Sequence, residues 1–499
     1  MNQEKTKKLL LFNTLTRQLE LFKPIFSPRV RVYTCGPTVY DHTHLGHMRT
    51  YTNTDILIRT LKYCDYQPYQ VMNITDVGHL TSDRNTGEDK LEKAAQREGV
   101  DAWQLVKKYS QEFFGVLDKL NINNPSVTPK ATENIAEMIL LVCELEKKGF
   151  AYQIDDGIYF NTSRFSNYGQ LANVSLADLE EGARVEKNIE KKNPTDFALW
   201  KFSNLKENRQ MEWPSPWAKR GFPGWHIECS VMAMKYLSDC FKGGKFYPER
   251  FETIDIHTGG IEHINVHHTN EIAQSEAATN KKFVNYWLHY NWLQVDGRKM
   301  SKSLGNFFTQ KDLADRGYQD LMFLRYLFLN THYRKRMNFT WEALDQAKKT
   351  YQEIIYLLRK IISQEEVINQ ETEEFRQTEK TSSYFTDFNK AVTTDLNMPQ
   401  ALAVVHRVLK DKGLFGSTRW HILKNFDQVL GLDLEKQVSG ALRESKKKIP
   451  QKIKTLVEVR QKNRQEENWR QADLVRAQIE AGGYLIEDTP TGPKLTPKK

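Results

Sequence analysis

Near the start of the chain, the order of hydrophobic and polar residues predicts a strand, a helix and a second strand in close succession. Residues 30–35 form a short β-favouring run, and the glycine and proline at 36–37 follow it at once. Residues 45–63 carry apolar or aromatic side chains at a helical spacing, and residues 69–74 form a second β-favouring run. A strand, a glycine turn, a helix and a strand make up the βαβ unit of a nucleotide-binding parallel sheet.

A second set of segments continues this pattern much later in the chain: 224–234, the strand 253–257, the helix 267–279 and the run 284–293. Between the two sets, residues 100–208 have a different character. They contain helical periods at 101–120 and 132–148, a run at 152–160 and a charged stretch at about 180–192. We interpret them as an insertion that divides one sheet domain into two halves.

Most of the chain after residue 320 has a helical hydrophobic period. Residues 320–425 predict a helical bundle. The tail predicts two further helices, the second capped by Asn468 and ending at Gly482. The predicted fold is therefore α/β, with a parallel-sheet domain in two halves (1–99 and 211–310), an insertion (100–210), a helical bundle (311–435) and a small C-terminal domain (436–499).

Composition excludes several classes of protein. The 499 residues are enough for roughly three domains, and 39% hydrophobic with 11% aromatic residues excludes a disordered chain. The sequence has no apolar run of about 18 residues and begins with charged and polar residues, so we expect a cytoplasmic protein without a membrane span. Its five scattered cysteines do not suggest a disulfide framework.

The net charge of +9 is concentrated at one end of the chain. Residues 436–499 contain 15 Lys and Arg against 8 Asp and Glu. Such a basic end suggests contact with a polyanion, but a solubilising tail would have the same composition. Charge alone leaves both interpretations open.

Two histidines, His44 and His47, lie between the first predicted strand and its helix. A helix N-terminus favours a phosphate, and Gly46 between the histidines leaves room for a flat base or a ribose. Neutral imidazoles there can donate hydrogen bonds to a reacting phosphate. Taken alone, this four-residue motif is weak, and two surface histidines at a helix start are the alternative.

Two lysines, Lys299 and Lys302, lie in a predicted loop rich in small polar residues and followed by Gly305. Such a mobile cationic loop could close over a triphosphate. The alternative is a solvent-exposed basic turn, which is what most short basic segments form. Its position some 250 residues after the histidine pair makes the combination far more informative than either part.

A third group has the chemistry of a metal site. Cys35 ends the first strand, Cys229 lies in the second half of the sheet domain, and His267 and Glu271 share one face of a predicted helix. Two thiolates, an imidazole and a carboxylate suit tetrahedral zinc. Buried cysteines and a surface His–Glu pair are the alternative. His268 is a competing ligand that points about a quarter turn away.

The histidine pair and the lysine loop together resemble the two signatures of class I aminoacyl-tRNA synthetases. Several further segments make the chain similar to the cysteinyl-tRNA synthetase family in particular. In the catalytic half these are 33–41 (YTCGPTVYD), 73–77 (NITDV), 213–217 (WPSPW), 224–230 (GWHIECS), 255–260 (DIHTGG), 267–276 (HHTNEIAQSE), 285–289 (NYWLH) and 299–306 (KMSKSLGN). In the helical and C-terminal parts they are 395–399 (DLNMP) and 468–473 (NWRQAD).

The resemblance implies a role for each matching residue. The zinc ligands it implies are Cys35, Cys229, His267 and Glu271. The cysteine-binding residues are Thr75, Trp225 and His257. The ATP-binding residues are Gly36, Thr38, His44, His47, Glu262 and Lys302, and the catalytic residues are His44, His47, Lys299 and Lys302. It also implies a Rossmann-type catalytic domain, a connective insertion, a bundle with stem-contact and anticodon-binding helices, and a C-terminal anticodon-recognition domain.

The activity implied is ATP-dependent formation of cysteinyl-adenylate, followed by transfer of cysteine to tRNA(Cys). We expect one Zn²⁺ per chain, Mg²⁺ with ATP, L-cysteine as the amino acid and a monomeric protein without membrane contact. A hydrophobic pocket separates cysteine from serine poorly, whereas zinc binds a thiolate far better than a hydroxyl. The alternatives are a cysteine ligase of the mycothiol type, which acts on an amino sugar, and an inactive tRNA-binding paralogue.

Four segments depart from the family's pattern. The residues after Val77 run differently from position 78 onward, Thr269 replaces a glutamate, residues 240–253 are additional, and the end at 491–494 lacks a tryptophan. None of these departures falls on a predicted zinc ligand. They leave open the contacts of the 78–90 loop and of the C-terminal tail.

Overall fold

The computed structural model describes residues 7–78, 89–173, 190–203, 209–301, 304–363, 378–445, 450–489 and 492–497. The chain forms two compact units, one from Met1 to Leu434 and one from Glu435 to Lys499. The predicted C-terminal domain begins at Lys436, next to the start of the second unit. The predicted sheet domain, insertion and bundle all lie within the first unit. Among the described residues, no helix is both long and apolar enough to cross a membrane.

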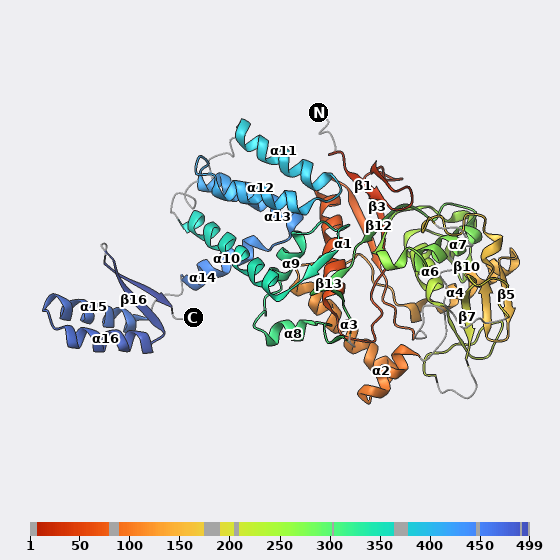
Figure 1. Cartoon of the computed structure of the whole chain (residues 1–499), viewed down its shortest axis with the longest axis horizontal. Coiled ribbons are helices and arrows are strands. Elements are labelled where there is room, and N and C mark those ends of the chain that lie inside the picture. Colours follow the sequence, from red (N-terminus) through yellow and green to blue (C-terminus); the bar gives the residue numbers. More distant parts are fainter. Residues whose placement is uncertain are drawn as a thin grey trace. The chain divides into compact units, whose positions relative to one another are not determined.

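A four-stranded parallel sheet organises the first unit, in the order β12-β11-β3-β4. Its strands are β3 (Arg29–Thr34), β4 (Gln67–Met72), β11 (Ile254–Gly260) and β12 (Val284–Tyr290). Helix α1 (Leu45–Tyr63) covers one face, and α6 (Trp225–Leu237) and α7 (His267–Thr279) lie on the other (Figure 1). The predicted α/β fold is confirmed.

The centre of this sheet is buried on both faces and apolar on one of them. Val30 and Val32 of β3 have no exposed surface, and neither have Ile254 and Ile256 of β11. Successive residues of a strand point to opposite faces, so these four side chains share one face, while the buried Tyr33, Asp255 and His257 point to the other. Because all four strands run the same way, their carboxyl ends meet at one edge. The strand order reverses between β3 and β11, which is where ligands bind in such sheets.

Between β4 and α6, helices are followed by a small antiparallel sheet in the order β5-β6-β7-β8. The helices are α2 (Lys90–Glu98), α3 (Ala102–Lys119), η1 (Ala131–Asn134) and α4 (Ile135–Lys147); the strands are β5 (Ala151–Ile154), β6 (Gly157–Phe160), β7 (Phe197–Phe202) and β8 (Gly221–Pro223), with η2 (Thr162–Arg164) after β6. The first of these helices and the last of these strands lie outside the predicted insertion of 100–210. The predicted run at 152–160 is in fact a hairpin, because a turn precedes Gly157. Of the charged stretch at 180–192, residues 180–189 lie outside the described residues.

A second small sheet, in the order β14-β13-β15, follows the parallel one along the chain. It consists of β13 (Leu293–Val295), β14 (Arg298–Lys299) and β15 (Met337–Phe339). Strand β15 lies inside the region predicted to be helical, so that prediction is wrong at this point. Met337 and Phe339 are buried while Asn338 is exposed, and this alternation is typical of a strand.

Helices complete the first unit: α8 (Gln310–Asp315), α9 (Met322–Leu329), α10 (Trp341–Ser363), α11 (Glu379–Thr393), α12 (Met398–Lys410) and α13 (Gly416–Leu430). The shorter elements are the hairpins β1 (Leu10–Asn13) with β2 (Gln18–Leu21) and β9 (Phe241–Lys242) with β10 (Lys245–Phe246), and the turns η3 (Pro248–Arg250) and η4 (Ile261–His263). The additional segment 240–253 is therefore the β9–β10 hairpin and η3.

A buried ion pair joins the bundle to the sheet domain. Asp55 of α1 lies 2.6 Å from Arg325 of α9, and neither side chain is exposed. Arg325 also donates to the carbonyl oxygens of Leu430 and Leu120, each at 2.9 Å. Burial would raise the pKa of Asp55, but the charges of Arg325 and Arg59 outweigh it and lower that pKa. The arginine therefore fixes the C-terminal half of α1 against the bundle.

The second unit contains α15 (Gln451–Gln465), α16 (Trp469–Ala481), β16 (Tyr484–Thr489) and β17 (Gly492–Pro497), preceded by α14 (Leu434–Ser445). Asn468 caps α16 by accepting from the Gln471 N–H, as predicted. Arg460 binds both carboxylate oxygens of Asp488, at 2.8 and 2.7 Å. Strands β16 and β17 pair as an antiparallel hairpin.

Candidate active site

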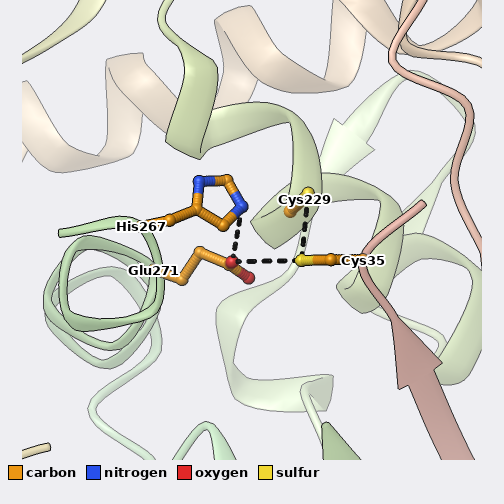
Figure 2. A group of neighbouring side chains, drawn as sticks. All are labelled: Cys35, Cys229, His267 and Glu271. Carbon is orange, nitrogen blue, oxygen red and sulfur yellow. Dashed lines mark hydrogen bonds and ion pairs between the residues drawn. The ribbon is translucent and has the colours of Figure 1, made fainter. Parts of the chain in front are cut away.

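The four predicted metal ligands meet at the carboxyl edge of the parallel sheet. Cys35 follows β3 directly, Cys229 lies on α6, and His267 and Glu271 lie one turn apart on α7. All four are buried, and one ligand atom from each lies within 4.8 Å of the others. Figure 2 shows the four side chains pointing toward one another. The two sulfur atoms are 4.0 Å apart, and His267 Nε2 is 3.0 Å from Glu271 Oε1.

The pKa values of this cluster reflect its charges as well as its burial. Burial would raise the pKa of Glu271, but His257 and His267 outweigh it and lower that pKa to about 2. Burial would lower the pKa of His267, but Glu271 and Cys229 raise it to about 10. The hydrogen bond from Cys35 and the charge of His267 lower the pKa of the Cys229 thiol. The buried cluster therefore pairs the Glu271 carboxylate with a protonated His267 imidazole, and burial raises the pKa of the Cys35 thiol. A bound cation would displace the protons of His267 and of the thiols.

The spacing and chemistry of these residues fit a tetrahedral cation. Zinc with bonds of roughly 2.0–2.3 Å holds its ligand atoms roughly 3.3–3.8 Å apart, close to the separations found here. The ring of His267 is also oriented for this role. Its Nδ1 lies 3.0 Å from Nδ1 of His226, which leaves Nε2 directed at the other three ligands. Metal-binding imidazoles generally have such a partner on the second nitrogen.

A second group of side chains overlaps the first and also has metal-ligand spacing. It shares Cys35 and Glu271 and adds His257 and His268. Nε2 of His268 lies 3.3 Å from the sulfur of Cys35, and its Nδ1 lies 2.8 Å from Nε2 of His289. The quarter turn between His267 and His268 therefore does not remove His268 from the site, because Cys35 approaches α7 from between them.

The predicted cysteine-binding residues surround this cluster. Nε2 of His257 lies 3.0 Å from the second carboxylate oxygen of Glu271, and the ring of Trp225 lies 4.4 Å from that of His267. Thr75 lies farther along the same edge, where its hydroxyl accepts a hydrogen bond from Asn73 at 3.0 Å. The structure thus places Trp225 and His257 against the ligands and Thr75 beside the turn after β3.

The turn that contains Gly36 and Thr38 is closed by the segment after β4. The Gly36 N–H donates to the Asn73 side chain at 2.8 Å, and Thr38 forms a β-bridge with Thr75. A Cβ atom on Gly36 would lie 1.5 Å from the carbonyl oxygen of Asn73, so only glycine fits there. Both predicted ATP contacts therefore lie in a turn fixed from the neighbouring strand.

The histidine pair begins α1. His44 is the N-cap, and its Nδ1 accepts from the N–H groups of Gly46 and His47, at 3.0 and 3.4 Å. An Nδ1 that accepts carries no proton, so the proton of the neutral ring is on Nε2. The two rings stack with centroids 3.7 Å apart. Burial lowers the pKa of His47 to about 4, so this ring is also neutral near pH 7.

Glu262, another predicted ATP contact, lies in η4 after the end of β11. Its carboxylate accepts a hydrogen bond of 3.0 Å from the indole N–H of Trp292. Sequence reasoning did not identify Trp292, which follows β12 and therefore reaches the same edge. The signal in the sequence was its place at the end of the predicted β-favouring run 284–293.

The lysine loop is described in part. Lys299 is exposed at the end of β14, and its carbonyl oxygen accepts from the side chain of Asn306 at 3.1 Å. The same side chain accepts from the Ser301 N–H at 2.8 Å, which joins the two ends of the loop. Lys302 lies outside the described residues.

Comparison with known proteins places this site in a family. Residues 21–349 match the family model described as the tRNA synthetases class I (C) catalytic domain. In sequence the chain is 40% identical over 495 residues to the cysteine–tRNA ligase of Treponema denticola, covering 96% of this chain and 98% of that protein. It is 41% identical over 488 residues to cysteine–tRNA ligase 1 of Burkholderia lata, covering 98% and 96%.

A solved structure supports the same fold at much lower sequence identity. The methionyl-tRNA synthetase of Mycobacterium tuberculosis, solved in complex with methionyl-adenylate, superposes with a TM-score of 0.58 over 82% of this chain and 93% of that one, at 14% identity. The fold and the family model together define a class I tRNA synthetase. Within that class, the near-complete match to the curated relatives shows that the chain belongs to the cysteine–tRNA ligase family.

Proposed function

We propose that the chain activates L-cysteine with ATP to form cysteinyl-adenylate and pyrophosphate, and then transfers cysteine to the 3'-terminal adenosine of tRNA(Cys) with release of AMP. The observation that carries this proposal is the buried group of Cys35, Cys229, His267 and Glu271 at the sheet edge that also bears the histidine pair. A cation in this group would bind the thiol of cysteine, and the neighbouring helix N-terminus would bind a phosphate of ATP. Membership of the cysteine–tRNA ligase family supports the same activity.

Zinc is the metal that best suits this group. It is a borderline-soft cation, so a set with two thiolates is preferred over the overlapping set that has one. Cys35, Cys229, His267 and Glu271 would hold it, and His226 would keep the ring of His267 in the required orientation. When bound, zinc would supply a site that takes the substrate thiolate and lowers the pKa of its thiol.

The remaining residues would bind and orient the reacting groups. His44 and His47 are neutral and lie at the positive end of α1, so they can donate to the α-phosphate without adding charge before the reaction. Lys299 and Lys302 would neutralise the charge that develops on the departing pyrophosphate, which has Mg²⁺ as its counter-ion. The indole of Trp292 would hold Glu262 in place for ATP.

Cysteine-dependent exchange of labelled pyrophosphate into ATP tests this proposal. The purified protein should catalyse exchange with cysteine and not with serine. Lys302→Ala should lower the exchange rate by roughly a hundredfold or more, because its charge is needed in the transition state, with little change in the KM for cysteine. Absence of exchange in the unaltered protein would contradict the proposal. Exchange without any charging of tRNA, but with ligation to an amino sugar, would favour the mycothiol-type alternative.

Metal analysis tests the ligand set separately from activity. The purified protein should contain about one zinc per chain, and Cys229→Ala should lose most of it. Cys64→Ala is the matched control, because Cys64 is equally buried but belongs to neither metal-binding group. Full zinc retention in Cys229→Ala, measured on folded protein, would remove this cysteine from the site.

A further inference from the structure

Arg49 is a buried cation with an unusual set of partners. It lies on α1, two residues after His47, and is 2% exposed. Among the described residues, its hydrogen-bond acceptors are all main-chain carbonyl oxygens. Burial lowers its pKa to about 10, so the guanidinium remains charged near pH 7. Such a group needs its hydrogen bonds, because a buried cation without partners is strongly unfavourable.

The carbonyl groups that Arg49 binds come from two distant segments. Its Nη1 donates to Asn291 and, at 3.2 Å, to Trp292, both directly before β13. Its Nη2 donates to Lys335 at 2.8 Å and makes a longer contact of 3.5 Å with His332, both shortly before β15. One planar group thus holds the starts of both parallel strands of the small sheet against α1.

This small sheet carries the first lysine of the loop. Strand β13 pairs with β14, which ends at Lys299. The chain after the loop also returns to α1, because the Leu45 N–H donates to the Phe308 carbonyl at 3.0 Å and His44 bridges to Thr309. Arg49 therefore fixes the incoming side of the loop to the same helix that fixes its outgoing side.

We propose that Arg49 is a positioning residue for adenylate formation: it holds the sheet that carries Lys299, and the Trp292–Glu262 pair, at a fixed distance from the histidine pair on α1. The inference rests on the proposed function and adds a residue to it. The sheet that carries Lys299 and the Trp292–Glu262 pair would both contact ATP, and the Arg49 side chain joins both of them to α1. Lysine cannot replace it, because an ammonium group cannot reach two separate pairs of carbonyl oxygens in one plane.

Arg49→Lys is the main test. Its maximal rate of cysteine-dependent pyrophosphate exchange should fall roughly 10- to 100-fold, because a displacement of about 1 Å in reacting groups has an effect of that order. The KM for ATP should rise and the KM for cysteine should not, since the hydrogen bonds of Arg49 lead to the segments 291–292 and 332–335 and not to Thr75, Trp225 or His257. Methylguanidinium should partly restore exchange in Arg49→Ala, whereas ethylammonium should not.

Arg325→Lys is the matched control. Arg325 is also fully buried, also anchors α1, and also binds main-chain carbonyl groups, but its partner Asp55 is two turns farther along the helix. Arg325→Lys should lower the melting temperature and leave the exchange rate of the folded protein near that of the unaltered chain. Equal effects of the two substitutions on exchange, or no effect of Arg49→Lys, would overturn the proposal and leave Arg49 as a packing residue.

Limited trypsin digestion gives a readout independent of activity. Cleavage after Arg298 and Lys299, which are both exposed, should be faster in Arg49→Lys than in Arg325→Lys under conditions where both are folded. Faster cleavage combined with no exchange in the unaltered protein would refute the proposed function, and with it the role of Arg49 in adenylate formation. Unchanged cleavage together with normal exchange would refute the positioning role alone.

Discussion

Removal of residues 435–499 should sharply reduce charging of tRNA while leaving cysteine activation almost unchanged. The cut falls between two compact units, so the first unit keeps its whole core, including the parallel sheet and the bundle. All the residues predicted to act on cysteine and ATP lie before residue 303. The removed part carries the basic excess of the chain and would supply contacts to tRNA phosphates. Charging at low tRNA concentration should therefore fall roughly a hundredfold or more.

Two measurements define this result. Pyrophosphate exchange and charging of tRNA(Cys) should be compared in the truncated and complete chains, and tRNA binding should be measured at several salt concentrations. The slope of affinity against salt should decrease in the truncated chain, because fewer counter-ions are released. An equal loss of both reactions would instead mean that the second unit stabilises the first.

A point substitution within the second unit can separate the contribution of base stacking to tRNA affinity from the contribution of net positive charge. Trp469 is 55% exposed, and the guanidinium of Arg464 lies 5.2 Å from the centre of its ring. An exposed aromatic ring beside a cation suits stacking of an unpaired base. In the same assays, Trp469→Ala should weaken tRNA binding by roughly tenfold with no change in the salt slope, since stacking is worth roughly 1–3 kcal/mol per base.

The sequence predicted where some of the candidate metal ligands lie in the fold, because those positions depend on local order. Cys35 follows a strand, and the helix from His267 carries Glu271 one turn later, so both positions could be inferred from periodicity alone. Their meeting with Cys229 could not be inferred, because it depends on how α6 and α7 cover the sheet. The resemblance to a family supplied that step, and the structure brings the ligand atoms within bonding reach of one cation.

Other features depend on contacts that no local pattern reveals. Strand β15 is only three residues long and lies among helices, so its alternation is too short to detect. An arginine within a predicted helix is normally expected to be exposed, and nothing in the sequence marks Arg49 as an exception. Its burial becomes clear only from the two distant segments that pack against it. The sequence named His268 as a competing ligand a quarter turn away, but helix geometry alone could not show that Cys35 lies within 3.3 Å of its Nε2.

The second large effect concerns the choice between cysteine and serine. If the substrate sulfur binds the metal directly, a cobalt-substituted protein should show a thiolate–metal absorption band that grows when cysteine is added. Serine should leave the band unchanged, because its hydroxyl does not ionise near neutral pH. Cysteine binding should also release a proton at pH values below the free thiol's pKa of about 8.5, as potentiometry or calorimetry in different buffers can measure.

The ligand set makes this test specific. Cys35 and Cys229 would by themselves give a thiolate band in the cobalt protein, so the relevant signal is the increase on adding cysteine, and Cys64→Ala should show the same increase. The thiolate preference alone should favour cysteine by several orders of magnitude, since a site built for one group rejects an analogue that lacks it by roughly 10⁴–10⁵. If cysteine leaves the band unchanged and releases no proton, the metal is structural. The choice between cysteine and serine would then have to lie with Thr75, Trp225 and His257, and Trp225→Ala should abolish it while metal content stays the same.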